Sequence, residues 1–116
     1  MNFKEKYPEF FPQDKYVEIS TEEGWDGLLD QLFTSLRTEK ADLHVLQIKQ
    51  KFGQLRFYYG VMNVSDRAHA LIDLAERDSS RICEVCGEQG QRVTNKNGWI
   101  KTLCEKHAQD AGFLKM

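Results

Sequence analysis

Residues 83–107 read CEVCGEQGQRVTNKNGWIKTLCEKH, and this stretch decides how the C-terminal third of the chain folds. All three cysteines of the protein and one of its three histidines fall here in two pairs of the same short spacing, Cys83-x2-Cys86 and Cys104-x2-His107. Two such pairs present four donors in the arrangement by which proteins hold a structural zinc ion. The sequence therefore predicts a zinc site on Cys83, Cys86, Cys104 and His107.

The residues between and after the two pairs predict a hairpin followed by a helix. Asn97-Gly98 is a strong turn signal between two strand-like runs. Residues 104–111 are typical of a short helix that ends at Gly112, so Cys104 and His107 would share one face of its first turn. A cysteine knuckle, a hairpin and a ligand-bearing helix in this order resemble a treble-clef zinc finger.

Other uses of the cysteines fit the pattern less well. Three cysteines cannot pair completely in disulfides, and we expect no signal peptide on this chain. A redox Cys-x2-Cys is the stronger alternative, but it would leave Cys104-x2-His107 without a role.

An enzyme is the less favoured functional class. Four protein ligands close the tetrahedron of a zinc ion and leave no position for an activated water. Treble-clef scaffolds also occur in metal-dependent nucleases, which need a general-base histidine, and only His44 and His69 are spare. We expect both to be ordinary histidines, so no catalytic residue is predicted, and a divergent nuclease is the enzymatic alternative.

Composition sets limits on the rest of the chain. The 116 residues, 41% hydrophobic and 29% charged, are typical of one small domain. Sixteen lysines and arginines against 18 acids argue against a dedicated duplex-DNA binder, which would be plainly basic. We find no apolar run long enough to span a bilayer and no lipidation motif, so we expect a cytoplasmic protein without a membrane partner.

Residues 1–81 predict an α+β fold that precedes the zinc unit. Apolar steps of three and four mark an amphipathic helix over 24–37, and Ser65 is a good N-cap for a second helix that runs towards residue 81. Between them, residues 43–61 predict a β-hairpin. We divide the single domain 1–116 into an aromatic N-terminal cover (1–23), a helix-hairpin-helix core (24–81) and a treble-clef-like zinc-binding unit (82–112).

The N-terminal cover is rich in aromatic residues and punctuated by two prolines. We expect it to pack irregularly over the core, because a small domain has few other residues with which to close it. An exposed docking surface is the alternative. The aromatic residues concerned are Phe3, Tyr7, Phe10, Phe11 and Tyr16.

The predicted hairpin has one apolar and one basic face. A two-residue turn at Gly53-Gln54 would pair Phe52 with Leu55, Gln50 with Phe57, Ile48 with Tyr59 and Leu46 with Val61. The opposite face would then carry Lys51 beside Arg56 and Lys49 beside Tyr58. Two cations placed directly across a ladder repel each other unless acids or a bound anion compensate.

Two interpretations of this basic face stay open. Lys49, Lys51, Arg56 and Tyr58 could form a contact surface for an acidic protein, a nucleic acid or a nucleotide phosphate. They could equally be solvated strand residues that protect an edge. Residues 1–30 hold three lysines against eight acids, so the acidic segment could also face the basic one within the fold.

Four blocks of the sequence resemble a family of small proteins found in bacteria, phages and prophages. They are GWDGLL (24–29), QIKQKFGQLRFY (47–58), CEVCG (83–87) and GWIKTLCEKH (98–107). The resemblance covers residues 24–108 and implies a zinc ion on Cys83, Cys86, Cys104 and His107, in a phage or mobile-element context. It implies no reaction, and it leaves the aromatic N-terminal stretch outside.

Two functional hypotheses follow from these observations. The first is a non-enzymatic, zinc-stabilised interaction protein, a phage or prophage accessory factor that binds and modulates a host or defence protein in the host cytoplasm. The second is a nucleic-acid or nucleotide-binding module that uses the basic hairpin, with Tyr58 and Trp99 as stacking groups.

Overall fold

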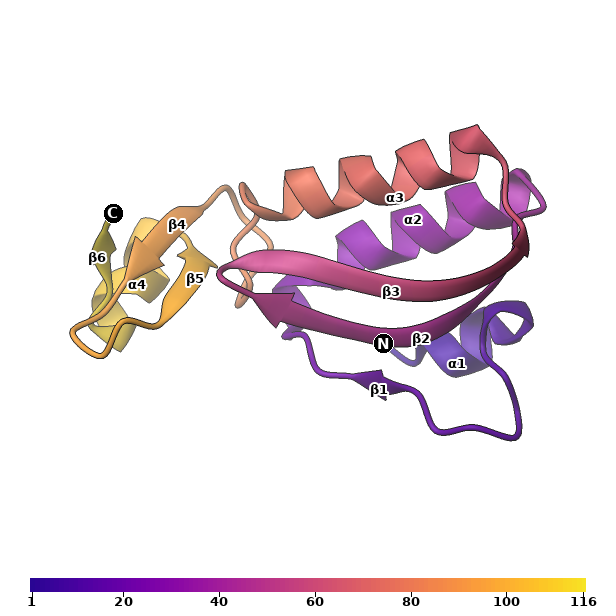
Figure 1. The fold of residues 1–116 in the computed structure, drawn as a ribbon. Coiled ribbons are helices and arrows are strands. Elements are labelled where there is room, and N and C mark those ends of the chain that lie inside the picture. Colours follow the sequence, from indigo (N-terminus) through magenta and orange to yellow (C-terminus); the bar gives the residue numbers. More distant parts are fainter.

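A long β-hairpin is the centre of the fold in the computed structural model, which describes the backbone of residues 1–116 and every side chain except that of Met62 (Figure 1). The chain forms one compact α+β domain with two three-stranded sheets, ordered β1-β2-β3 and β5-β4-β6. The elements are α1 (Phe3–Lys6), the 3-10 helix η1 (Pro8–Phe10), β1 (Glu18–Ile19), the 3-10 helix η2 (Glu23–Trp25), α2 (Asp26–Thr38), β2 (Asp42–Lys51), β3 (Gln54–Asn63), α3 (Asp66–Ser79), β4 (Gln91–Thr94), β5 (Ile100–Leu103), α4 (Glu105–Ala111) and β6 (Leu114–Lys115).

Both predicted core helices are confirmed, and they lie side by side over one face of the hairpin (Figure 1). Helix α3 begins after Ser65, whose hydroxyl oxygen accepts the amide N–H of Ala68 as a helix cap does. The apolar stripe of α2 is buried as predicted and centres on the fully buried Phe33. One face of the sheet is therefore covered by helices.

The hairpin turn lies one residue earlier than predicted. Phe52 and Gly53 occupy the turn with φ angles of 56° and 77°, and Lys51 pairs with Gln54. Two residues with positive φ are the signature of a type I′ turn, which matches the twist of the flanking strands. Contacts from the C-terminal unit support this backbone: the Arg92 guanidinium donates to the Phe52 carbonyl at 2.6 and 3.0 Å, and the Thr102 hydroxyl donates to the Gly53 carbonyl at 2.5 Å.

The earlier turn changes which residues pair across the strands. Near the turn each residue keeps its predicted face, because β3 is displaced along β2 by two positions, an even number. Ile48 now pairs with Phe57 on the covered face. On the other face Lys49 pairs with Arg56, where Lys51 was expected, and Gln47 pairs with Tyr58, where Lys49 was expected.

A bulge at Leu46 overturns the rest of the predicted apolar face. Val45 pairs with Tyr59 and Gln47 pairs with Tyr58, so Leu46 has no partner and is 50% exposed. The expected pairing of Leu46 with Val61 is wrong, because the bulge turns Val45 inward in its place.

The N-terminal segment packs on the same side of the sheet as the helices, as expected. Four of its aromatic rings surround Phe33 at centroid distances between 5.1 and 5.7 Å. Tyr16 differs from this prediction, since it is 85% exposed. The four buried rings are those of Phe3, Tyr7, Phe10 and Phe11.

The C-terminal unit lies at the turn end of the hairpin and has a small core of its own (Figure 1). Strands β4 and β5 form the predicted hairpin, and α4 ends at Gly112 in a left-handed conformation with φ 76°. The sequence did not predict β6, which adds a two-residue edge to β4. Among the described residues, no helix has the length and apolar character to cross a membrane.

Candidate metal centre and binding face

The four predicted ligands come together at one point of the C-terminal unit. Cys83 and Cys86 belong to the turn that follows α3, which closes through the Gly87 amide donating to the Cys83 carbonyl at 2.9 Å. Gly87 itself has φ 82°, a conformation that favours glycine. Cys104 is the N-cap residue of α4, and His107 lies in the first turn of that helix.

The donor atoms of these residues have the spacing that a single metal ion requires. All four lie within 4.8 Å of one another. The sulfurs of Cys86 and Cys104 are 3.8 Å apart, and Nδ1 of His107 lies 3.7 Å from the Cys83 sulfur and 3.1 Å from the Cys104 sulfur. Zn–S bonds of about 2.3 Å place two sulfurs of a tetrahedron about 3.8 Å apart. The cluster is therefore compatible with a zinc site.

The electrostatics of the cluster prepare Cys83 to act as a thiolate. Burial alone would raise the pKa of its thiol, but the amides of Cys104, Cys86 and Val85 point at the sulfur and lower the pKa to about 7. For Cys86, the Glu88 amide lowers the pKa, whereas desolvation and the neighbouring thiols together raise it above its ordinary value. A metal ion binds the thiolate form of cysteine, so the backbone around Cys83 favours ligation.

A buried carboxylate inside the knuckle ties the metal centre to the hairpin. Glu84 is only 2% exposed. Its carboxylate accepts the Thr102 amide at 2.7 Å and both oxygens accept from Nε2 of Gln50, at 3.1 and 3.2 Å. Burial raises the pKa of Glu84, while these donors favour its charged form. Gln50 also donates to the Ile100 carbonyl at 3.1 Å, so one side chain of β2 joins the knuckle to β5.

The knuckle also packs backbone to backbone against η2, directly before α2. The Gly24 amide donates to the Glu84 carbonyl at 2.8 Å, and a Cβ at position 24 would collide with backbone atoms of Cys83 and Glu84. Beside this contact, Nε1 of Trp25 donates to the Ile82 carbonyl at 2.9 Å. The metal centre is therefore joined to both the sheet and the helical layer.

The predicted basic residues lie on the face of the hairpin that the helices leave open. Lys49 and Arg56 are direct neighbours across the ladder, and Tyr58 lies on the next row, 42% exposed. The Lys49 ammonium is 5.9 Å from the centroid of the Tyr58 ring. Lys51 lies beside the turn, with its ammonium 5.6 Å from the Phe52 ring.

The acidic N-terminal segment makes its ion pairs elsewhere. Lys6 with Asp30 at 2.8 Å and Arg37 with Glu9 at 2.6 Å tie the segment to α2. Across the described residues, none of the ion pairs includes Lys49, Lys51 or Arg56. The acidic segment does lie beside the basic one, because β1 pairs with β2 through Glu18 and Gln47, but it does not neutralise the cations of the basic face through an ion pair.

The two spare histidines lie apart from the metal centre and from each other. The His44 ring packs over Gly60, its cross-strand neighbour. His69 of α3 is hydrogen-bonded through Nδ1 to the hydroxyl of Tyr59. Burial raises the pKa of Tyr59, with Asp73 and Glu76 adding to the effect.

Sequence reasoning missed Glu84 and Gln50 as parts of the site. The available signal was Gln50 itself, a polar residue placed in the otherwise apolar face of the hairpin. A buried amide needs hydrogen-bond partners, so its position implied a polar group packed against it. No feature of the sequence named Glu84 as that group.

Comparisons with known proteins add no family. No family model matches the chain, and neither the curated proteins nor the solved structures contain a match.

Proposed function

We propose that this protein is a zinc-stabilised, non-catalytic binding module whose contact surface is the open face of β2 and β3. One observation carries the proposal: Lys49 and Arg56 lie side by side on an exposed sheet face without an acidic partner, next to a half-exposed Tyr58. Like charges directly across a ladder are destabilising unless an anion compensates, which favours a bound acidic partner over the alternative that these side chains only protect the β3 edge.

The metal in this proposal is zinc with a structural role. Three thiolates and an imidazole suit zinc better than the hard cations, which prefer oxygen ligands. The four donors fill a tetrahedron, and the order of knuckle, hairpin and helix supports a treble-clef-like unit. Zinc here holds the knuckle closed, and the reduced thiols favour the cytoplasm as the compartment.

The partner is a macromolecule that this face recognises. A phage or mobile-element context is compatible with a host or defence protein bound by an accessory factor. The chemistry of the face itself, two cations beside Tyr58, favours the other candidate, a nucleic acid or nucleotide.

Zinc binding is tested by native mass spectrometry of the purified protein. We expect one zinc per chain, lost in His107→Ala and retained in the control His44→Ala, whose ring lies away from the cluster. Full zinc occupancy in His107→Ala would contradict the assigned ligand set.

The contact surface is tested by affinity capture from lysate, with and without nuclease. The wild type is compared with Lys49→Glu/Arg56→Glu and with the control Lys96→Glu, which changes an exposed lysine of the β4–β5 turn. We expect the captured macromolecule to be lost with the double variant alone. Equal capture by all three proteins would overturn the assignment of the face.

A further inference from the structure

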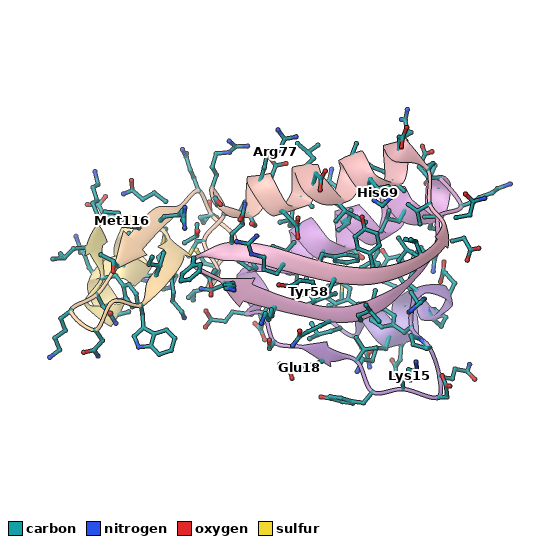
Figure 2. The ribbon with its side chains drawn as sticks, in the orientation of Figure 1. Lys15, Glu18, Tyr58, His69, Arg77 and Met116 are labelled. Carbon is teal, nitrogen blue, oxygen red and sulfur yellow. The ribbon has the colours of Figure 1, made fainter. Side chains whose placement is uncertain are left out.

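The open face of the curved β2–β3 hairpin forms a platform for side chains (Figure 1). On the opposite face of the hairpin, the cross-strand pair Ile48 and Phe57 is buried in the core. Because side chains alternate along a strand, the residues next to these two in sequence point outward. Figure 2 shows Tyr58 on this hairpin, with Glu18 on β1 nearby and His69 on the helical layer. From the Lys51 row to the Gln47 row the platform is about 13 Å long, at about 3.3 Å per residue.

The positive charge of this platform is not neutralised within the chain. Lys49 and Arg56 face each other, and Nε of Arg56 is buried without a hydrogen-bond partner in the described part of the chain. Glu18 lies on the same face, but it pairs in register with Gln47 at the β1 edge, one row away from the two cations. An anion beside Lys49 and Arg56 would remove their repulsion.

An aromatic ring stands next to this positive charge. Tyr58 is 42% exposed and lies diagonally across from Lys49, 5.9 Å from ammonium to ring centroid. A planar base can stack on an exposed tyrosine, while cations beside it hold the neighbouring phosphates. Gln47, in register with Tyr58, adds an amide that can hydrogen-bond to a base edge.

We propose that this face binds single-stranded nucleic acid. Lys49, Arg56 and Lys51 contact the phosphates, and Tyr58 stacks on a base, over a footprint of a few nucleotides. The inference rests on the proposed function and names the partner class of the same surface.

A single strand fits better than a duplex or a protein. Duplex readers insert a helix or a β-ribbon into a groove, whereas these residues lie on the broad outer face of a curved hairpin whose other face is covered by helices, in a chain of net charge −2. Protein interfaces depend on buried apolar anchors and are poor in lysine. Among the described residues of this face and its turn, the exposed apolar side chains are Tyr58, Leu46 and Phe52, and lysines lie beside Tyr58 and Phe52.

The binding test is fluorescence anisotropy of a labelled ten-nucleotide single strand of mixed sequence, titrated with zinc-loaded full-length protein. If three cations contact phosphate, affinity should fall with a log–log slope near −2, or about 20-fold between 50 and 200 mM salt. Lys49→Ala should reduce the magnitude of that slope by about 0.7. The charge-matched control Lys96→Ala should leave it unchanged.

The stacking contact has its own matched pair. Tyr58→Ala should weaken binding about 5- to 150-fold, because a stacked base contributes that range. Tyr16→Ala removes a tyrosine that is more exposed than Tyr58 and lies outside the hairpin, so it should not change the affinity for the single strand. Circular dichroism and zinc content check that each variant is folded.

Three results would overturn the inference: no salt-dependent binding by the wild type, equal losses in the Tyr16 and Lys96 controls, or equal affinity for a duplex of the same length. The capture experiment distinguishes a failure of the nucleic-acid inference from a failure of the proposed contact surface. Capture of a nuclease-resistant protein that Lys49→Glu/Arg56→Glu abolishes would reject nucleic acid and keep the face as a contact surface. Capture unaffected by that variant would reject both proposals.

Discussion

Replacing Gly24 with alanine tests the packing between the metal centre and the helical layer. The Gly24 amide donates to the Glu84 carbonyl at 2.8 Å, and the position of a new Cβ is closer to that carbonyl and to the Cys83 oxygen than the 3.0 Å that real Cβ atoms keep. The three atoms nearest to it all belong to the backbone of the knuckle. No rotamer change can relieve the contact, so the knuckle and η2 must move apart.

The size of the effect follows from the two interactions that are lost. Overpacking in a close-packed site costs about 1–3 kcal/mol, and stretching the Gly24–Glu84 hydrogen bond adds about 1 kcal/mol. We therefore expect Gly24→Ala to lower the free energy of unfolding by about 2–4 kcal/mol. At about 4 °C per kcal/mol for a chain of this size, the midpoint of thermal unfolding falls by about 8–16 °C.

The neighbouring Gly27 supplies the control. It lies in α2, and a Cβ added there would have no neighbouring atom within 4 Å, so Gly27→Ala should stabilise the protein by up to about 1 kcal/mol through helix propensity. Urea unfolding of the metal-loaded proteins, followed by circular dichroism, measures both changes. A Gly24→Ala protein within about 0.5 kcal/mol of the wild type, a typical surface-substitution effect, would refute the argument from packing.

Three further predictions concern the metal, the core and pH. Metal removal by a chelator, or His107→Ala, should destabilise the whole domain in thermal unfolding, whereas a wild-type midpoint in metal-free protein would show that the centre contributes nothing to folding. Phe33→Ala should lower the free energy of unfolding in urea by about 3–5 kcal/mol, because its ring is fully buried among four N-terminal rings. A decrease below about 1 kcal/mol would mean that the N-terminal cover is not packed on Phe33. The hydrogen bond from Lys6 lowers the pKa of the Asp30 carboxyl below its ordinary 3.8. The ionised Asp30 therefore stabilises the fold at neutral pH, and this stabilisation is lost as pH falls through the lowered pKa. The urea midpoints of wild type and Asp30→Asn should accordingly converge on acidification, and parallel curves would contradict this.

Features with a local sequence signal were predictable from the chain. The periodicity of 24–37 and the Ser65 cap indicated the two helices, and the two short-spaced ligand pairs indicated the metal centre, because each depends on residues a few positions apart. The burial of the N-terminal aromatic rings was also predictable, since a small core needs closing.

Features held by distant contacts were not predictable. The turn at Phe52-Gly53 is supported by Arg92 and Thr102, which are 40 and 49 positions away, and Phe52 adopts a φ that its residue type disfavours. The bulge at Leu46 and the two-residue β1 are likewise set by tertiary packing. Between the turn and the bulge the predicted faces survived, because sliding a ladder by an even number of positions does not exchange its sides, whereas at the bulge Leu46 moved out and Val45 moved in.

The same distant contacts link the candidate metal centre to the proposed binding face. Thr102 donates its hydroxyl to the hairpin turn and its amide to Glu84 in the knuckle, so one residue of β5 contacts both. The turn sets the register, and the register places Lys49 opposite Arg56. Because the knuckle is closed by its four donors, release of the metal removes a support of that turn. Zinc loss should therefore weaken binding at a face that contains none of its ligands, and a Thr102→Val protein that retains zinc should share part of that loss.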